Sequence, residues 1–318
     1  MTEDHTSLDA YAPVDIAARV EAGGVVKANF DMATILALAV LAGAFIGLGA
    51  NFATIVLTDT GVGYGLSRLA GGLVFSLGLI LVLVGGAELF TGNILMVMAW
   101  ASGKVSTLRL LRNWALVYAG NFIGALATAV GVYGSRQWAF DGHRVGATAL
   151  TIASAKVQYD FLAAFMLGVF CNALVCLAVW LSFSARTTTD KILAIIPPIT
   201  AFVAVGFEHS IANMYFIPLG LWLRDNSRVI EMAGKAPEQF ADLTWMGFFG
   251  SNLLPVTLGN LVGGGVLVAA VYWFVYLRRR PDNRFVQLWG RVRLPQARQH
   301  WSGVSEDAGD VRPPHRER

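Results

Sequence analysis

The chain has 318 residues, of which 55% are hydrophobic and 14% charged, and its mean hydropathy is +0.57. A soluble domain carries about 25% charged residues, so this composition excludes an ordinary soluble protein and predicts an integral membrane protein. The length leaves room for about six or seven spans in one domain. The first ten residues, MTEDHTSLDA, are polar and acidic without a basic region, so no cleaved signal peptide is expected.

The chain begins with a polar segment, residues 1–28, that we expect to lie in the cytoplasm. The stretch after its proline, VDIAARVEAGGVVKA, predicts a short amphipathic helix. The candidates for the apolar side of this helix are Val14, Ala17, Ala18 and Val25.

The membrane domain is expected over residues 29–278. It contains six apolar segments, each matching or exceeding the roughly 20 residues that cross a bilayer. These segments are residues 30–58, 69–100, 114–134, 159–183, 192–223 and 246–277. The fold class predicted is therefore an all-α membrane protein.

A basic tail, residues 279–318, follows the last apolar segment and is rich in Arg, Pro and Gly. Its composition predicts a disordered cytoplasmic segment. The RRRP run at 278–281 is expected to anchor the last helix at the headgroups of membrane lipids, and no nucleic-acid partner is expected.

Two segments carry an interruption near their middle. Residues 69–100 contain GGAELFTGN, and residues 192–223 contain GFEHSIAN. Each would be roughly 48 Å long as one helix, against a hydrocarbon core of about 30 Å. Glu208 and His209 are the ionisable side chains of the second segment, and such groups at this depth usually face a partner, a cavity or a permeation path. We therefore predict two broken helices, the second carrying the central residue of an anion pore.

Each break starts a second half-helix, whose free N–H groups favour negative charge. Thr91 and Ser210 are residue types suited to cap these starts. Irregular backbone at membrane depth must be satisfied by protein or water. Four polar residues are accordingly expected to stabilise the breaks, namely Glu88, Asn93, Glu208 and Asn213.

Three short motifs recur in the same order in the two halves. KANFD and KVQYD enter the first and fourth spans, ELFTGN and EHSIAN occupy the second and fifth, and GNFIG and GNLVG the third and sixth. The offsets are 129, 120 and 139 residues. With three spans in each half, at residues 29–134 and 159–277, the copies must have opposite orientations. Inverted repeats with discontinuous helices place the site near the midplane.

The repeat puts Lys27 and Lys156 at opposite mouths of the predicted pore. A lysine at each entrance raises the local concentration of small anions. A lysine at this depth also suits snorkelling to the headgroups. The sequence is consistent with both roles.

Basic residues give the orientation. With both termini inside, 17 lysines and arginines fall on the cytoplasmic side and seven on the other. The positive-inside rule then places both termini in the cytoplasm. The ten arginines after Leu277 supply this difference, because the remaining counts are seven and seven.

The distribution of histidines and cysteines limits cofactor chemistry. Four of the five histidines lie in terminal or loop regions, which excludes a haem held by two histidines and disfavours a histidine-cluster metal site, so no cofactor is expected. Cys171 and Cys176 lie five residues apart on one predicted helix, so no structural disulfide is expected. His209 stands where the first half has Leu89. Imidazole titrates near physiological pH, and this asymmetry favours a functional role for His209.

These motifs resemble a known family. GFEHSIANMYFIPLG at 206–220 and GAELFTGN at 86–93 resemble the two signatures of the formate–nitrite transporter family, and the resemblance extends over about residues 14–278. It implies an aquaporin-like protomer of six helices, with the second and fifth broken. It also implies a homopentamer in the bacterial inner membrane, with one pore in each protomer.

The same resemblance implies roles for individual residues. His209 matches the central histidine, Thr91 its hydrogen-bonding neighbour, and Asn172 a residue that lines the pore. Apolar constrictions on either side are implied at Phe75, Leu79, Leu89, Phe90, Val175 and Phe202.

The resemblance also bears on the substrate. DKILAIIPP, GFEHS, FIPLG and LLPVTLGN resemble the formate branch, whereas GAELFTGN has Glu88 where formate channels often have Asp and is closer to the nitrite branch. We expect formate, with nitrite next. Hydrosulfide and other small monovalent weak-acid anions stay open.

Two mechanisms are open for the predicted centre. In our hypothesis His209 lends a proton, so the substrate crosses as the neutral acid. In the alternative it only donates a hydrogen bond and the anion passes as such. An intramembrane serine protease is a distant rival, since neighbours such as His209 and Ser210 do not face each other on a helix and no G-x-S-x-G motif occurs. An ammonium-type channel would be expected to use paired pore histidines, so we expect a transporter and no enzyme.

Overall fold

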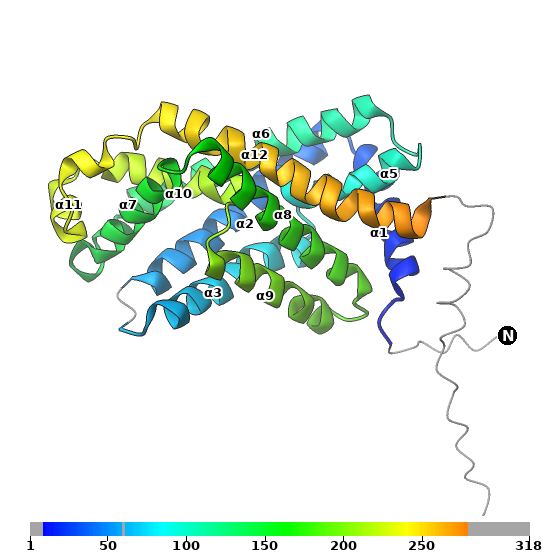
Figure 1. Cartoon of the computed structure of the whole chain (residues 1–318), viewed down its shortest axis with the longest axis horizontal. Coiled ribbons are helices and arrows are strands. Elements are labelled where there is room, and N and C mark those ends of the chain that lie inside the picture. Colours follow the sequence, from blue (N-terminus) through cyan, green and yellow to red (C-terminus); the bar gives the residue numbers. More distant parts are fainter. Residues whose placement is uncertain (1–8, 59–60, 279–318) are drawn as a thin grey trace, which may run out of the picture. The chain divides into compact units, whose positions relative to one another are not determined.

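The computed structural model describes residues 9–58 and 61–278, and the predicted tail, residues 279–318, lies outside them. The regular structure of the described residues consists of helices (Figure 1). Six are long and apolar enough to cross a membrane: α2 (Met32–Leu57), α3 (Tyr64–Gly85), α6 (Thr107–Gly134), α8 (Phe161–Ser184), α9 (Thr188–Val205) and the last, Gly247–Leu277. The predicted all-α membrane fold is confirmed.

Both predicted interruptions are present. After α3 the chain unwinds and restarts as α4 (Phe90–Asn93), η1 (Ile94–Met96) and α5 (Val97–Ala101). After α9 it unwinds and restarts as α10 (Ser210–Leu223). Gly86 and Gly206 close the two first halves with φ of +79° and +83°, the left-handed conformation that glycine adopts without steric cost.

Close helix contacts occur at equivalent places in the two halves. α2 packs on α6, and α8 packs on α12 (Leu254–Val262), which η5 (Gly247–Leu253), η6 (Gly263–Ala270) and η7 (Trp273–Leu277) extend as π-helical turns. A Cβ on Gly124 would lie 1.9 Å from the carbonyl oxygen of Val40, and one on Gly263 would lie 2.0 Å from that of Val169. These pairs are related by the predicted offsets, so glycine permits the same backbone approach twice.

The first helix, α1 (Pro13–Ala28), packs against α5 and η1. Its buried apolar residues are Ile16, Ala17, Val20, Gly24 and Ala28. The apolar side predicted from sequence is wrong in part, because Ala18 is exposed and Val14 is only half-buried. The spacing of three or four residues from Ala17 to Ala28 forms one stripe, and Ala18 lies about 100° away from it.

The sequence analysis missed the helices between the third and fourth spans and between the fifth and sixth. They are η2 (Gln137–Ala139), η3 (Asp141–His143), α7 (Arg144–Val157), α11 (Ser227–Ala233) and η4 (Pro237–Phe240). Only α7 has the length of a typical helix, and it packs against α10. This contact brings its last residues to the second break.

Candidate functional site

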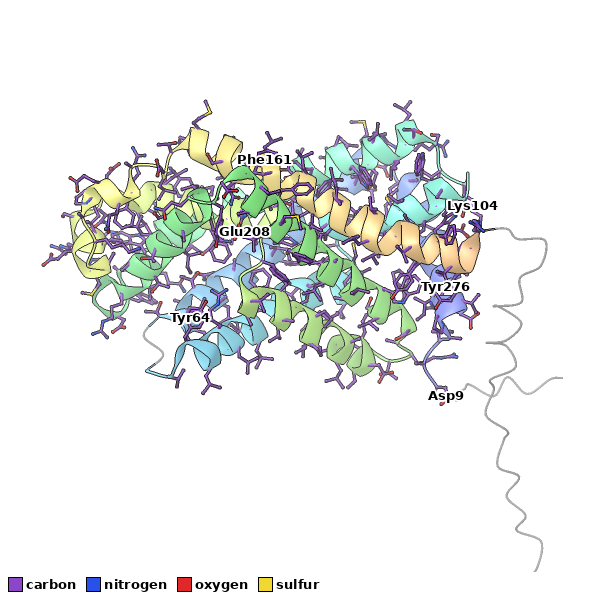
Figure 2. All side chains as sticks on the ribbon, viewed as in Figure 1. Asp9, Tyr64, Lys104, Phe161, Glu208 and Tyr276 are labelled. Atoms are coloured by element: carbon purple, nitrogen blue, oxygen red, sulfur yellow. The ribbon has the colours of Figure 1, made fainter. Side chains whose placement is uncertain are left out.

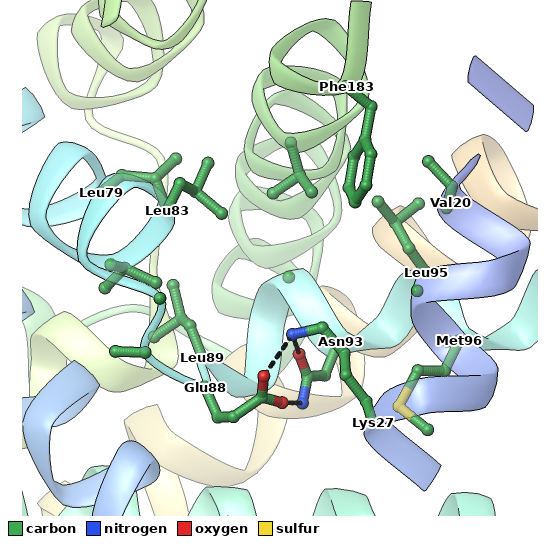
Figure 3. Close-up of a pocket in the computed structure, with 17 residues that line it drawn as sticks. Val20, Lys27, Leu79, Leu83, Glu88, Leu89, Asn93, Leu95, Met96 and Phe183 are labelled. Atoms are coloured by element: carbon green, nitrogen blue, oxygen red, sulfur yellow. Dashed lines mark hydrogen bonds and ion pairs between the residues drawn. The ribbon is translucent and has the colours of Figure 1, made fainter. Parts of the chain in front are cut away.

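The first break is held by a network of side chains from three elements. Lys27 Nζ on α1 lies 2.6 Å from Glu88 Oε1 and donates to Asn93 Oδ1 at 2.9 Å. Asn93 Nδ2 donates to Glu88 Oε2 at 2.7 Å and to Asn113 Oδ1 on α6 at 3.0 Å. Figure 3 shows Glu88, Asn93 and Lys27 converging from the break, α4 and α1. The carboxylate and the ammonium therefore satisfy each other at this depth.

The second break repeats this network with equivalent residues. Lys156 Nζ on α7 lies 2.8 Å from Glu208 Oε1, and Asn213 Nδ2 donates to Glu208 Oε2 at 2.7 Å. Asn252 takes the place of Asn113, since its Oδ1 accepts from Asn213 at 2.7 Å and its amide binds the carbonyl of Lys156. In Figure 2, Glu208 lies among the interior side chains.

Two further asparagines clamp the unwound backbone. Asn121 Oδ1 accepts from the Phe90 N–H at 2.9 Å, while its Nδ2 donates to the carbonyls of Ala39 and Glu88. The sequence analysis found this residue and Asn260 as a repeat match but gave them no role. Each satisfies three backbone groups that helical hydrogen bonds would otherwise pair.

Asn260 makes the same three contacts in the second half. Its Oδ1 accepts from the Ser210 N–H at 3.0 Å, and its Nδ2 donates to the carbonyls of Gly168 and Glu208. The clamps are therefore part of the repeated scaffold.

Thr91, Asn172 and His209 meet at one buried polar centre. Thr91 Oγ1 lies 3.0 Å from His209 Nε2. Asn172 Nδ2 donates to the carbonyls of Asn260 at 2.7 Å and of Thr91 at 3.3 Å. The Cys176 thiol also points to the Thr91 carbonyl, at 3.4 Å, and both cysteines are free.

The caps predicted at the half-helix starts are wrong. The N-cap of α4 is Leu89, which makes no side-chain cap bond, and the N-cap of α10 is His209. His209 Nδ1 accepts a hydrogen bond from the Ala212 N–H at 3.1 Å. Thr91 and Ser210 fall inside the first turns, because the extended backbone that defines a cap ends one or two residues earlier.

This cap bond fixes the form of the imidazole. Nδ1 accepts from a backbone N–H, so the proton of the neutral ring resides on Nε2. Nε2–H then donates to Thr91 Oγ1, and the Thr91 hydroxyl keeps its own hydrogen for another acceptor. A doubly protonated ring would place an N–H against the Ala212 N–H.

Two cavities approach this centre along opposite ends of α3. The first vestibule has a volume of about 260 Å³ and is lined by residues that include Lys27, Leu79, Glu88 and Leu89. The second vestibule has a volume of about 240 Å³ and is lined by residues that include Arg68, Phe75, Lys156, Phe202 and His209. Leu79 and Phe75 lie one turn apart on α3, so a short apolar region separates the two cavities.

The remaining predicted pore residues line neither vestibule. Thr91, Asn172 and Val175 are buried beside the centre. Phe90 faces away, with its ring packed edge-on against Trp114 and Tyr118 of α6.

The two vestibules differ in charge. Each contains one lysine paired with one glutamate, but only the second also contains Arg68. The Arg68 guanidinium binds the carbonyls of Val203 and Ala204 at the end of α9, and it pairs with no carboxylate of residues 9–58 and 61–278. The second vestibule therefore carries an uncompensated positive charge.

Tyr159 also lines the second vestibule. Burial raises the pKa of its hydroxyl, and the negative charge of Glu208 raises the pKa further. The hydroxyl is therefore protonated at neutral pH and is a neutral hydrogen-bond donor at this wall.

Six spans, two broken helices and two cavities that meet at one polar centre define a multi-pass membrane protein of the channel class. The model of the family described as formate/nitrite transporter matches residues 14–274. The chain belongs to the formate/nitrite transporter family.

Individual relatives agree with this assignment. The formate channel FocA of Escherichia coli strain K12 is 43% identical over 278 residues, which cover 86% of this chain and 98% of that protein. The formate channel FocA of Haemophilus influenzae is 41% identical, with coverage of 81% and 92%. A solved structure described as a pentameric formate channel with formate bound is 45% identical, with a TM-score of 0.73 and coverage of 78% of this chain and 98% of that chain.

The Lys156–Glu208 pair generates a prediction about stability. Glu208→Gln leaves the Lys156 ammonium, whose side chain is 14% exposed, without its counter-ion, and breaking a buried pair costs about 3–5 kcal/mol. We expect a clearly lower melting temperature for the detergent-solubilised protein. Asp225→Asn is the control, because the Asp225 side chain is 85% exposed and should be within error of wild type. A Glu208→Gln protein as stable as this control would contradict the assigned role.

Proposed function

We propose that the chain forms a pore for small monovalent weak-acid anions and that its substrate is formate. The observation that carries the proposal is a single polar centre, Thr91 with His209, between two vestibules with apolar inner walls. The names of the relatives and of the formate-bound neighbour support formate. Nitrite is the second candidate, and its support is the Glu88 of the first break.

The proposal includes the surroundings of the pore. The protein is a homopentamer in a bacterial inner membrane, with both termini in the cytoplasm. Residues 1–28 and 279–318 are then cytoplasmic, and the first vestibule opens to the cytoplasm. The pentameric neighbour and the charge distribution support this arrangement.

Recruitment takes place in the second vestibule. Lys156 is paired with Glu208, so its charge is largely compensated at the mouth. Arg68 supplies the net positive potential that attracts an anion. Its carbonyl contacts hold the guanidinium at the wall rather than in the path.

Selection takes place at the apolar region between the vestibules. Phe75 and Phe202 pack edge to face with ring centroids 5.6 Å apart, and the Phe202 ring stacks on the His209 imidazole at 5.9 Å. A hydrated ion loses its water against such walls, and the loss disfavours charge. Only a small anion that gains hydrogen bonds at the centre offsets this cost.

The centre supplies donors. The Thr91 hydroxyl hydrogen and the His209 Nε2–H are the groups that a passing carboxylate would accept from. Proton lending by His209 would require an imidazolium, which the Ala212 cap bond opposes. The geometry therefore favours the alternative in which His209 stays neutral and donates a hydrogen bond.

Substrate class is tested by flux in proteoliposomes of the purified protein. We expect formate to cross fastest, nitrite to cross more slowly, and ammonium not to cross above empty liposomes. Selective ammonium flux, or formate flux equal to that of empty liposomes, would contradict the proposed function.

His209→Asn tests the role of the imidazole. Asparagine is a strong N-cap residue, so the protein should assemble normally. Loss of a donor to a charged group, worth about 1.5–3 kcal/mol, should lower formate flux at least about tenfold. The shape of the pH dependence should persist, because it would arise from the substrate. A pH dependence that disappears in the variant would support proton lending instead.

Arg68→Gln tests recruitment. The formate KM for entry from the second vestibule should rise several-fold at low ionic strength, and the difference should shrink in high salt. Entry from the first vestibule should be unchanged, and Arg68→Lys, which keeps the charge, should resemble wild type. Equal effects from both sides would show that Arg68 acts through the fold.

A further inference from the structure

The polar centre is the place where the two halves of the repeat differ. The residues that stabilise the breaks are of the same type in both halves. Offsets of 120 and 129 residues pair the three residues of the centre with unlike ones: Thr91 with Ile211, His209 with Leu89, and Asn172 with Gly43. Whatever allows Asn172 to occupy its position is therefore specific to the second half.

A glycine faces Asn172 across the helix contact. A Cβ on Gly264 would lie 2.4 Å from Asn172 Nδ2 and 2.7 Å from Cys176 Sγ, closer than real Cβ atoms come. The equivalent of Gly264 in the first half, 139 residues earlier, is Ala125. Alanine opposite glycine in one half is thus exchanged for glycine opposite asparagine in the other.

Asn172 cannot yield without losing a contact. Its Nδ2 is held between two carbonyl oxygens, that of Asn260 at 2.7 Å and that of Thr91 at 3.3 Å. Asn172 is fully buried, so no bulk water replaces a lost partner. A methyl group at position 264 would push the amide away from one or both carbonyls.

We infer that Gly264 is a positioning residue for the polar centre. The space it leaves lets the Asn172 amide hold the Thr91 carbonyl. This contact fixes the first turn of α4 and sets the Thr91 hydroxyl 3.0 Å from His209 Nε2. The inference rests on the proposed function for its transport readout, whereas its steric basis is tested by stability alone.

The transport experiment compares neighbouring glycines of η6. Gly264→Ala should lower the maximal formate flux about tenfold, the loss expected from one broken buried hydrogen bond, with little change in KM. Gly265→Ala is the matched control, because its Cβ would meet only ordinary contacts, the nearest at 3.5 Å from Ile94, and its flux should match wild type. Equal flux in the two variants would overturn the inference.

The stability experiment places Gly264→Ala in a background with room for it. Asn172→Gly with Cys176→Gly reproduces the residues of the first half, Gly43 and Gly47. The drop in melting temperature caused by Gly264→Ala should be smaller in this background than in the wild-type chain, since the clash is removed. An equal or larger drop would overturn the inference. Wild-type protein without formate flux would refute the proposed function and leave this comparison valid.

Discussion

The structure depends on one constraint, that backbone removed from helical hydrogen bonding at membrane depth must find partners in the protein. Both broken helices meet it in the same way. An asparagine on the third helix of each half, Asn121 or Asn260, binds two carbonyls and one N–H of the unwound segment. A lysine, glutamate and asparagine then neutralise the charge that the break brings inside. The result is two vestibules that end at irregular backbone.

Function is assigned to the positions that escape this symmetry. A scaffold with two equal halves would present the same surface to a substrate from both sides. Thr91, Asn172 and His209 each replace an apolar residue or glycine of the other half, and Arg68 adds charge to one vestibule only. A single polar centre between apolar walls follows from these few substitutions.

Much of the fold was predictable from sequence, because hydropathy locates the spans and the interrupting motifs locate the breaks. The repeat also predicted that Glu88 and Glu208 share a task. The caps were not predictable from residue type, because the N-cap is set by backbone conformation, and His209 takes that position where serine was expected. The pairing of Lys27 with Glu88 and of Lys156 with Glu208 joins residues 61 and 52 positions apart, and no local pattern indicates such contacts. The Arg68 contacts to the end of α9 were missed for the same reason.

The central claim is that the Ala212 cap bond keeps His209 neutral with its proton on Nε2. Nitrogen-15 NMR of the protein in lipid bilayers, with the other four histidines replaced, reports the protonation of each ring nitrogen directly. From about pH 8 to about pH 5, the range in which a free imidazole becomes charged, Nδ1 should keep the shift of an unprotonated acceptor and Nε2 that of an N–H. Protonation of both nitrogens within this range would contradict the account.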